Sequence, residues 1–429
     1  MKYEKIDPRL FVENRERLKK QLKKNSILVL NSNDIYPTNA DGVMPFKQNN
    51  DLFYFTGIEQ EDTMFVMYPD SAEERFKEVL FIRNVNSDLI TWEGEKLNEK
   101  KAREISGIQS IYRFSEFDNL FNFLVSDAEN IYLNTNEFRR SADEVETRDD
   151  RFVKKCKARY LLNNYLRAAP LIYRLRMIKS DIEIDLLRKA SELTEKGFRR
   201  ILKFVKPNVT ESEIEAEFAH EFIRHGGAFA DYEPIIAAGA NSCALHYIKN
   251  SGVCKSGELV LMDVGASYAN YNSDMTRTIP VNGRFTPRQR EVYNAVLRIH
   301  KQSRKLMVKG KTMLTLFKET ESLAEKELVD LKLLKTADIK NQNPDFPLIK
   351  KYYPHNLSHF LGLDVHDVGY YDEPLRPGMV LTNEPGIYIK DEGFGIRLEN
   401  NIVITESRNI DLLENVPIEA EEIEEIMNS

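Results

Sequence analysis

The sequence predicts an α/β domain over residues 1–174, followed by an α+β domain over residues 175–429. A chain of 429 residues exceeds the usual size of one compact domain. Its first part alternates short apolar runs with helical segments, whereas its second part joins long helices to irregular antiparallel strands. Ser180 and Glu183 form a capping box at the start of a long amphipathic helix, so we place the boundary just before it.

In the first domain, apolar runs rich in β-forming residues predict the strands of a mixed sheet. The expected strands cover residues 26–31, 53–56, 63–68 and 79–82. Charged segments with a helical period predict helices over residues 98–105, 114–125 and 160–168. A basic stretch at residues 15–24 is typical of the solvated face of an N-terminal amphipathic helix.

The second domain begins with two predicted helices and then becomes rich in strands and turns. The helices are expected over 181–203 and 210–225, and a capping box of Thr210 with Glu213 begins the second. Two later helices are expected over 287–305 and 315–331. The expected strands cover residues 235–238, 259–264, 266–271, 275–281, 379–382, 386–389 and 401–405.

Composition excludes several classes of function. The formal net charge of −7 argues against a general nucleic-acid surface, which needs clustered lysine and arginine. The N-terminus has no apolar core of a secretory signal, and no apolar run of about 18 residues predicts a membrane span. Three cysteines, without the pairing of a metal site, are typical of reduced thiols. We therefore expect a cytoplasmic protein without nucleic-acid or membrane partners.

Two aspartates mark the first candidate site. Asp263 ends an apolar strand, and Asp274 follows eleven residues later, after a polar connection. If the flanking strands form a hairpin, both carboxylates can face one point, where they repel each other unless a cation lies between them. The alternative is a pair of unrelated turn aspartates, which suits Asp274 better than Asp263.

The histidines are concentrated in the C-terminal third. His355 and His359 have the spacing of one helix face, although such a pair alone is more often a surface or core feature. His366 precedes Asp367, which could orient its ring. His246 follows a strand-like run and a turn.

Two glutamates complete the set of candidate ligands. Glu384 follows an apolar strand directly, and Glu399 lies in a strand-rich run with Arg397 on the same face. The alternative for Arg397 and Glu399 is an ordinary surface ion pair. Taken together, two aspartates, two glutamates and a histidine suit Mn²⁺, Zn²⁺, Co²⁺ or Fe²⁺ in a two-metal centre rather than structural zinc. Such centres catalyse hydrolysis.

Long motifs in a fixed order resemble the pita-bread metallopeptidases, and most closely the Xaa-Pro aminopeptidases of the aminopeptidase P family. The C-terminal motifs are ALHYIKN, LMDVGASYANYNSDMTRTIPVNGRFTPRQREVY, SHFLGLDVHDVG, LRPGMVLTNEPGIYI and GIRLENNIVIT. Near the N-terminus, FKQNNDLFYFTGIEQED resembles the creatinase-like first domain of that family. The resemblance covers nearly the whole chain and implies a creatinase-like domain followed by a pita-bread domain.

The resemblance also implies a role for each candidate residue. The five metal ligands would be Asp263, Asp274, His359, Glu384 and Glu399. Asp274 and Glu399 would contact both ions, and Glu384 would accept the proton of the bridging water. Outside the ligand set, His246 and His366 would contact substrate and assist proton transfer, while His355 and Arg397 would line the substrate site.

The implied reaction is hydrolysis of the first peptide bond in peptides that have proline in the second position. Two divalent ions, with Mn²⁺ as the first choice and Co²⁺, Zn²⁺ or Fe²⁺ as alternatives, would supply a bridging hydroxide. Trp92 would form a wall of the proline pocket, from a neighbouring subunit of a homodimer or homotetramer, or else would pack in a core. Two other functions stay open: an Xaa-Pro dipeptidase (prolidase), and a metal-free pita-bread hydrolase or binding module.

Overall fold

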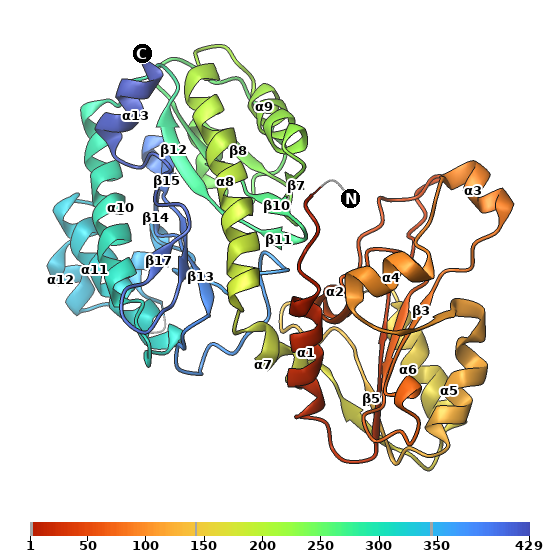
Figure 1. Cartoon of the computed structure of the whole chain (residues 1–429). Coiled ribbons are helices and arrows are strands. Elements are labelled where there is room, and N and C mark those ends of the chain that lie inside the picture. The colour runs from red at the N-terminus through yellow and green to blue at the C-terminus, as the bar shows by residue number, and fades with distance from the viewer. Residues whose placement is uncertain (1–2, 142–143, 344–345) are drawn as a thin grey trace. The chain divides into compact units, whose positions relative to one another are not determined.

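A computed structural model describes residues 3–141, 144–343 and 346–429 and divides the chain into two compact units (Figure 1). The first unit runs from Glu4 to Arg176, and the second comprises Met177 to Ser429 together with Tyr3. Among the described residues, no helix combines the length and apolarity that crossing a bilayer requires.

The first unit contains one six-stranded mixed sheet, with strand order β4-β3-β2-β1-β5-β6. The central strand β1 is antiparallel to β2 and parallel to β5, which confirms the mixed sheet. Every residue of β1 is buried, because helices cover both faces of the sheet. The strands are β1 (Ser26–Asn31), β2 (Met64–Met67), β3 (Glu78–Ile82), β4 (Ser110–Arg113), β5 (Asn130–Leu133) and β6 (Asn164–Arg167).

Aromatic packing closes one face of this sheet. Phe117 and Phe121 of α5 stack with ring centroids 5.2 Å apart, and both rings also contact Phe152 of α6. These rings pack on alternate residues of the strands, such as Ile27 and Val29. The helices are α1 (Arg9–Lys19), α2 (Asn50–Thr56), α3 (Ser87–Glu93), α4 (Glu99–Ser106), α5 (Phe117–Val125), α6 (Arg148–Arg159) and α7 (Ala169–Arg176).

Two predictions of secondary structure in this unit are wrong. Residues 53–56 form the end of helix α2 rather than a strand, because Asn49 caps the helix start and the left-handed Gly57 ends it. The expected helix over 160–168 is absent, and residues 164–167 form strand β6, which pairs in parallel with β5. In both segments the apolar run is too short for periodicity to distinguish a helix from a strand.

The expected solvated face of the N-terminal helix is also only partly correct. Arg15 is 1% exposed. Its guanidinium donates to Glu78 at 2.9 Å and to the carbonyl oxygens of Phe55 and Ser106 at 2.7 and 2.9 Å. Arg15 therefore joins α1 to three separate segments of the unit, which a local charge pattern cannot reveal.

The second unit places helices around several small antiparallel sheets, as the α+β prediction requires. Its helices are α8 (Asp181–Phe204), α9 (Glu211–Arg224), α10 (Pro287–Leu306), α11 (Met313–Asp330), α12 (Thr336–Lys340) and α13 (Ala420–Met427). Its strands are β7 (Ala228–Phe229), β8 (Ile235–Ala238), β9 (Leu259–Asp263), β10 (Ala266–Tyr268), β11 (Tyr271–Asn272), β12 (Thr276–Pro280), β13 (Val380–Asn383), β14 (Gly386–Ile389), β15 (Phe394–Arg397), β16 (Asn400–Val403) and β17 (Ile410–Asp411).

Strand pairing in the second unit determines where the candidate residues lie. β9 pairs antiparallel with β12, so that Thr276 lies opposite Asp263. Between them, the single strand expected over 266–271 is a tight hairpin of β10 and β11, because Ala269 and Asn270 adopt left-handed backbone angles. α8 and α9 lie on one side of this unit, and α10 and α11 lie on the other (Figure 1).

A buried aspartate in the first unit gives a prediction about pH and stability. Asp149 accepts a hydrogen bond from Asn31, and burial raises the pKa of its carboxyl from 3.8 to about 7. Between those values the folded chain retains a proton that the unfolded chain releases, so the free energy of unfolding falls as the pH rises. The difference between the two pKa values corresponds to a fall of roughly 4 kcal/mol in the free energy of unfolding.

Asp149→Asn should remove this fall in stability between about pH 4 and pH 7, because the amide keeps the acceptor for Asn31 and does not titrate. Urea unfolding at a series of pH values measures the effect. Asp41→Asn, at an exposed position of the same unit, is the matched control and should leave the pH profile unchanged. Parallel pH profiles for wild type and Asp149→Asn would contradict the assignment.

Candidate metal centre and active site

Three strand ends bring carboxylates together in the second unit. Asp263 ends β9, Asp274 lies two residues before β12, and Glu399 lies between β15 and β16. The amide of Glu399 donates to the carbonyl oxygen of Thr276 at 3.0 Å, which holds the third strand end beside the first two. The hairpin expected to bring Asp263 and Asp274 together is therefore present, as the paired strands β9 and β12.

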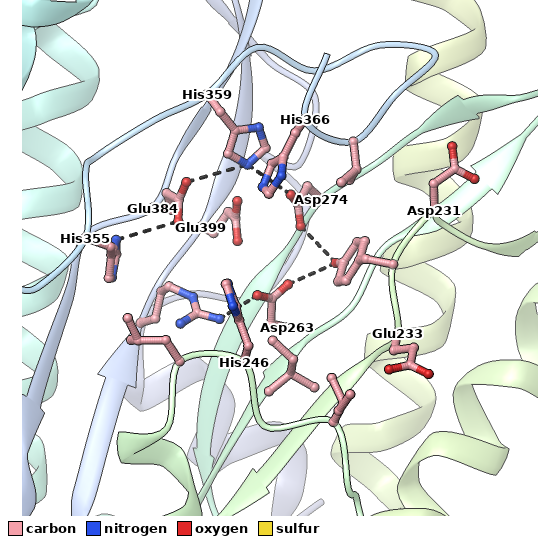
Figure 2. A pocket seen from close by; sticks show the side chains of 16 residues that line it. Asp231, Glu233, His246, Asp263, Asp274, His355, His359, His366, Glu384 and Glu399 are labelled. Atoms are coloured by element: carbon pink, nitrogen blue, oxygen red, sulfur yellow. Dashed lines mark hydrogen bonds and ion pairs between the residues drawn. The ribbon is translucent and has the colours of Figure 1, made fainter. Parts of the chain in front are cut away.

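His359 and Glu384 complete the cluster from the opposite wall of the pocket (Figure 2). The Nε2 atom of His359 lies 3.4 Å from Asp274 Oδ2 and 3.6 Å from Glu384 Oε1. Its Nδ1 atom lies 2.9 Å from the carbonyl oxygen of Phe360, which can only accept a hydrogen bond. Nδ1 therefore carries a proton, and Nε2 is the ring nitrogen that faces the carboxylates and could bind a metal ion.

These ligand atoms lie close enough to share an ion. Donor atoms of Asp274, His359 and Glu399 all lie within 4.8 Å of one another. Burial raises the pKa of Asp274, Glu384 and Glu399 well above the usual range, and neighbouring carboxylates raise it further. A divalent cation would relieve both effects, so this donor set of buried carboxylates and one imidazole fits hard or borderline metal ions.

Arg397 is the cation that the structure itself provides to the cluster. It is 4% exposed, and its guanidinium donates to Asp263 at 2.5 Å, to Tyr388 at 2.7 Å and to Thr276 at 2.9 Å. The alternative of an ordinary surface pair with Glu399 is therefore wrong. One guanidinium beside four carboxylates leaves the cluster with a formal charge of −3 when all are ionised.

The helical arrangement considered for His355 and His359 is wrong, because residues 352–369 contain no helix. His355 Nε2 lies 2.8 Å from the hydroxyl of Tyr388, and burial lowers the pKa of its imidazole to about 3. The rings of His359 and His366 meet edge to face with centroids 4.3 Å apart. His246 extends into the pocket from the side opposite His359 and His366 (Figure 2).

A pocket of about 310 Å³ contains nearly all the residues that the sequence singled out. It is lined by His246, Asp263, Asp274, His355, His359, His366, Glu384, Arg397 and Glu399. Trp92 is the exception, because it lies on α3 of the first unit with 87% of its surface exposed. Packing of Trp92 in the core of its unit is therefore excluded, and its contact with substrate stays a prediction.

Family models match both units of the chain. The model of metallopeptidase family M24 matches residues 185–406, and the model of the aminopeptidase P N-terminal domain matches residues 11–132. The Xaa-Pro aminopeptidase of Haemophilus influenzae is 34% identical, with 99% of this chain and 98% of the relative covered. The chain belongs to metallopeptidase family M24.

Solved structures agree with this membership of family M24. Zinc-substituted aminopeptidase P of Escherichia coli, in complex with product, superposes with a TM-score of 0.88 at 33% identity over 99% of both chains. Aminopeptidase PepP of Pseudomonas aeruginosa gives a TM-score of 0.89 at 29% identity, with 99% of this chain and 98% of that chain covered. The expected enzyme class, a metallo-exopeptidase with a creatinase-like first domain and a pita-bread second domain, is confirmed.

Four residues that support this M24 site were missed at the sequence level. The hydroxyl of Tyr232 lies within hydrogen-bonding distance of both Asp263 and Asp274, at 2.9 and 2.8 Å, and can donate its one proton to either. Thr276 donates to Glu399 at 2.6 Å. Two further side chains bind the backbone of the ligands. Asn401 accepts from the amide of Asp274 and donates to its carbonyl oxygen, and Arg277 donates to the carbonyl oxygen of Glu399. Thr276, Arg277 and Asn401 lie within three residues of a candidate ligand in the sequence, whereas Tyr232 is more than thirty residues from the nearest one.

The segment that carries His246 is held by one buried carboxylate, Glu211. Its Oε1 accepts from the amide of Ala238 at 2.8 Å and from Asn241 at 2.9 Å. Its Oε2 accepts from the hydroxyl of Tyr247 at 2.8 Å and from the amide of Gly252 at 2.5 Å. Four donors from residues 238–252 thus converge on a side chain that is 0% exposed.

Glu211→Gln should loosen this segment and lower the free energy of unfolding by about 1–3 kcal/mol, because the amide nitrogen cannot accept and leaves buried donors unpaired. Chemical unfolding and limited proteolysis within residues 239–252 provide the measurements. Glu215→Gln is the control, since Glu215 accepts one bond, from Asn250 at 2.9 Å. Equal effects of the two substitutions would contradict the role given to Glu211.

Proposed function

We propose that this enzyme removes the first residue from peptides that have proline in the second position. The observation that carries the proposal is the convergence of four carboxylates and His359 in a pocket of about 310 Å³. The relatives named Xaa-Pro aminopeptidase, at 34% identity over nearly the whole chain, support this choice of substrate. We propose residues 175–429 as the catalytic domain and residues 1–174 as the creatinase-like domain.

We propose that Asp263, Asp274, His359, Glu384 and Glu399 hold two divalent ions, with Mn²⁺ as the first choice. Carboxylate oxygens with a single imidazole suit Mn²⁺ and also accept Co²⁺, Zn²⁺ or Fe²⁺. Asp274 and Glu399 would serve both ions, and their donor atoms lie within 4.8 Å of one another and of that of His359. When bound, such a metal pair lowers the pKa of a shared water enough to supply hydroxide near neutral pH.

The side chains around the cluster would transfer protons and contact the substrate. Glu384 accepts a proton from the attacking water and passes it on. His366 and His246 line the same pocket and are assigned to the oxyanion and to protonation of the departing proline nitrogen. His355 is held neutral by burial, so it contacts substrate as a hydrogen-bonding group without a charge. Arg397 holds Asp263 and faces the substrate.

Two further proposals concern subunit assembly and cellular location. Trp92 is proposed to contact the proline ring from a neighbouring subunit of a homodimer or homotetramer, because the ring is exposed in the single chain. A cytoplasmic location is proposed because Cys156, Cys243 and Cys254 are all free thiols.

Asp263→Ala and His359→Ala should each abolish hydrolysis of an Xaa-Pro peptide, because each would remove a proposed metal ligand. The folded fraction, measured by circular dichroism and size-exclusion chromatography, should change little. Phe346→Ala, at an exposed position that does not line the pocket, is a control that should retain full turnover. Turnover at the wild-type rate in either ligand variant would refute the assignment.

Metal binding can be measured without any reaction. Mn²⁺ added to chelator-treated protein should raise the melting temperature, because an ion bound only by the folded state stabilises it. Asp274→Asn should reduce this rise strongly, since the neutral amide is a weaker ligand than the carboxylate. An equal rise in both proteins would place the ion elsewhere, and no rise in the wild type would favour the metal-free alternative.

Substrate length separates the aminopeptidase from the prolidase. We expect hydrolysis of Xaa-Pro-Yaa and of longer peptides in the presence of Mn²⁺, because the relatives at 34% identity are named Xaa-Pro aminopeptidases rather than dipeptidases. Rates for an Xaa-Pro dipeptide, a tripeptide and a pentapeptide with the same first residue provide the comparison. Cleavage of the dipeptide alone would identify a prolidase.

A further inference from the structure

A second cavity lies beside the candidate active site and shares a wall with it. This cavity, of about 490 Å³, is called here the basic groove and is lined by Leu245, Tyr352, Pro354, Tyr388 and three lysines. Leu245 lines both the groove and the active-site pocket. Tyr388 also joins the two cavities, because it lines the groove while its hydroxyl contacts Arg397 at 2.7 Å and His355 at 2.8 Å.

The groove has a uniform charge. Its lysines are Lys350, Lys351 and Lys390, and none of its lining residues within the described ranges is acidic. Lys350 pairs with Glu321 at 2.6 Å, and Lys351 pairs with an exposed aspartate at 3.3 Å. Lys390 has neither an ion pair nor a hydrogen bond with the residues that the structure describes, so its ammonium group is available to a ligand.

The active-site pocket is acidic at the end that lies away from the basic groove. Asp231 and Glu233 lie on the wall that faces away from His355 (Figure 2). His355 follows directly after Pro354, which lines the basic groove, so the acidic wall and the basic groove lie at opposite ends of the pocket. A peptide has the same polarity, with an ammonium group at one end and a carboxylate at the other.

We propose that the basic groove binds the C-terminal carboxylate of short peptide substrates. This inference rests on the proposed function and adds a preference for peptides whose free C-terminus reaches Lys351 and Lys390. Charge complementarity identifies the carboxylate as the ligand, and continuity through Leu245 and Tyr388 connects it to the reacting bond. The apolar residues that line the groove would pack against the substrate side chains between the proline and the C-terminus.

The length of β14 gives the expected size of the substrate. The strand runs from Gly386, two residues after Glu384, to Ile389, and Lys390 follows it. At about 3.3 Å per residue, the path from Gly386 to Lys390 spans roughly 13 Å, which is the length of about four extended peptide residues. The preference should therefore be largest for peptides of about four to six residues.

The test compares peptides that have proline in the second position, each as a free acid and as a C-terminal amide, from three to seven residues. With Mn²⁺ present, the wild-type KM for the amide should exceed that for the acid by about three- to tenfold at the preferred length, as two exposed ion pairs would produce. The double variant Lys351→Gln with Lys390→Gln should bring this ratio close to one. Added salt should also reduce the ratio in the wild type.

Lys305→Gln is the matched control, because Lys305 is an exposed lysine of α10 outside the groove, and it should keep the wild-type ratio. A ratio near one at every length in the wild type, or an unchanged ratio in the double variant, would overturn the inference while the peptidase function stands. Failure of the wild type to cleave any of these peptides would contradict the proposed function, and this inference with it.

Discussion

Four carboxylates around one guanidinium, two of them buried and two half-buried, are the constraint on which the second unit depends. Carboxylates packed so closely together repel one another and lose hydration. The protein must therefore supply hydrogen bonds and a counter-charge, and this set of donor atoms also suits a metal ion. Arg397 supplies one positive charge directly to Asp263. The pKa of Asp274, Glu384 and Glu399 is raised because protein groups alone do not fully offset the burial of these carboxyls and the repulsion between them.

The surrounding strands serve to hold these carboxylates at fixed positions. Arg277, which is 0% exposed, donates to the backbone of Glu399 at 2.7 Å and of Thr276 at 2.9 Å, and so ties β12 to the turn between β15 and β16. Asn401 donates to the carbonyl oxygen of Asp274 at 2.6 Å. Charged and amide side chains thus take the place of sheet hydrogen bonds where the ligands interrupt the sheets.

Much of the fold followed from local patterns. Capping boxes gave the starts of α8 and α9, because a cap acts over a few neighbouring residues. Apolar runs gave three of the six strands of the first unit and most strands of the second. The same patterns failed at α2 and β6, where short apolar runs fit either a helix or a strand. They also placed Arg15 in solvent, although its partners come from segments about 40 to 90 residues away.

The sequence by itself determined the chemical type of the site, because the identities of its carboxylates and histidines limit the ions and reactions that they support. It also gave the order of the motifs that mark the family. Only the tertiary structure decided which groups surround the cluster: Tyr232 from a loop, Thr276 from a facing strand and Tyr388 at the wall of the basic groove. The physical reason is that these contacts join segments distant in sequence, and no local propensity encodes which segments meet.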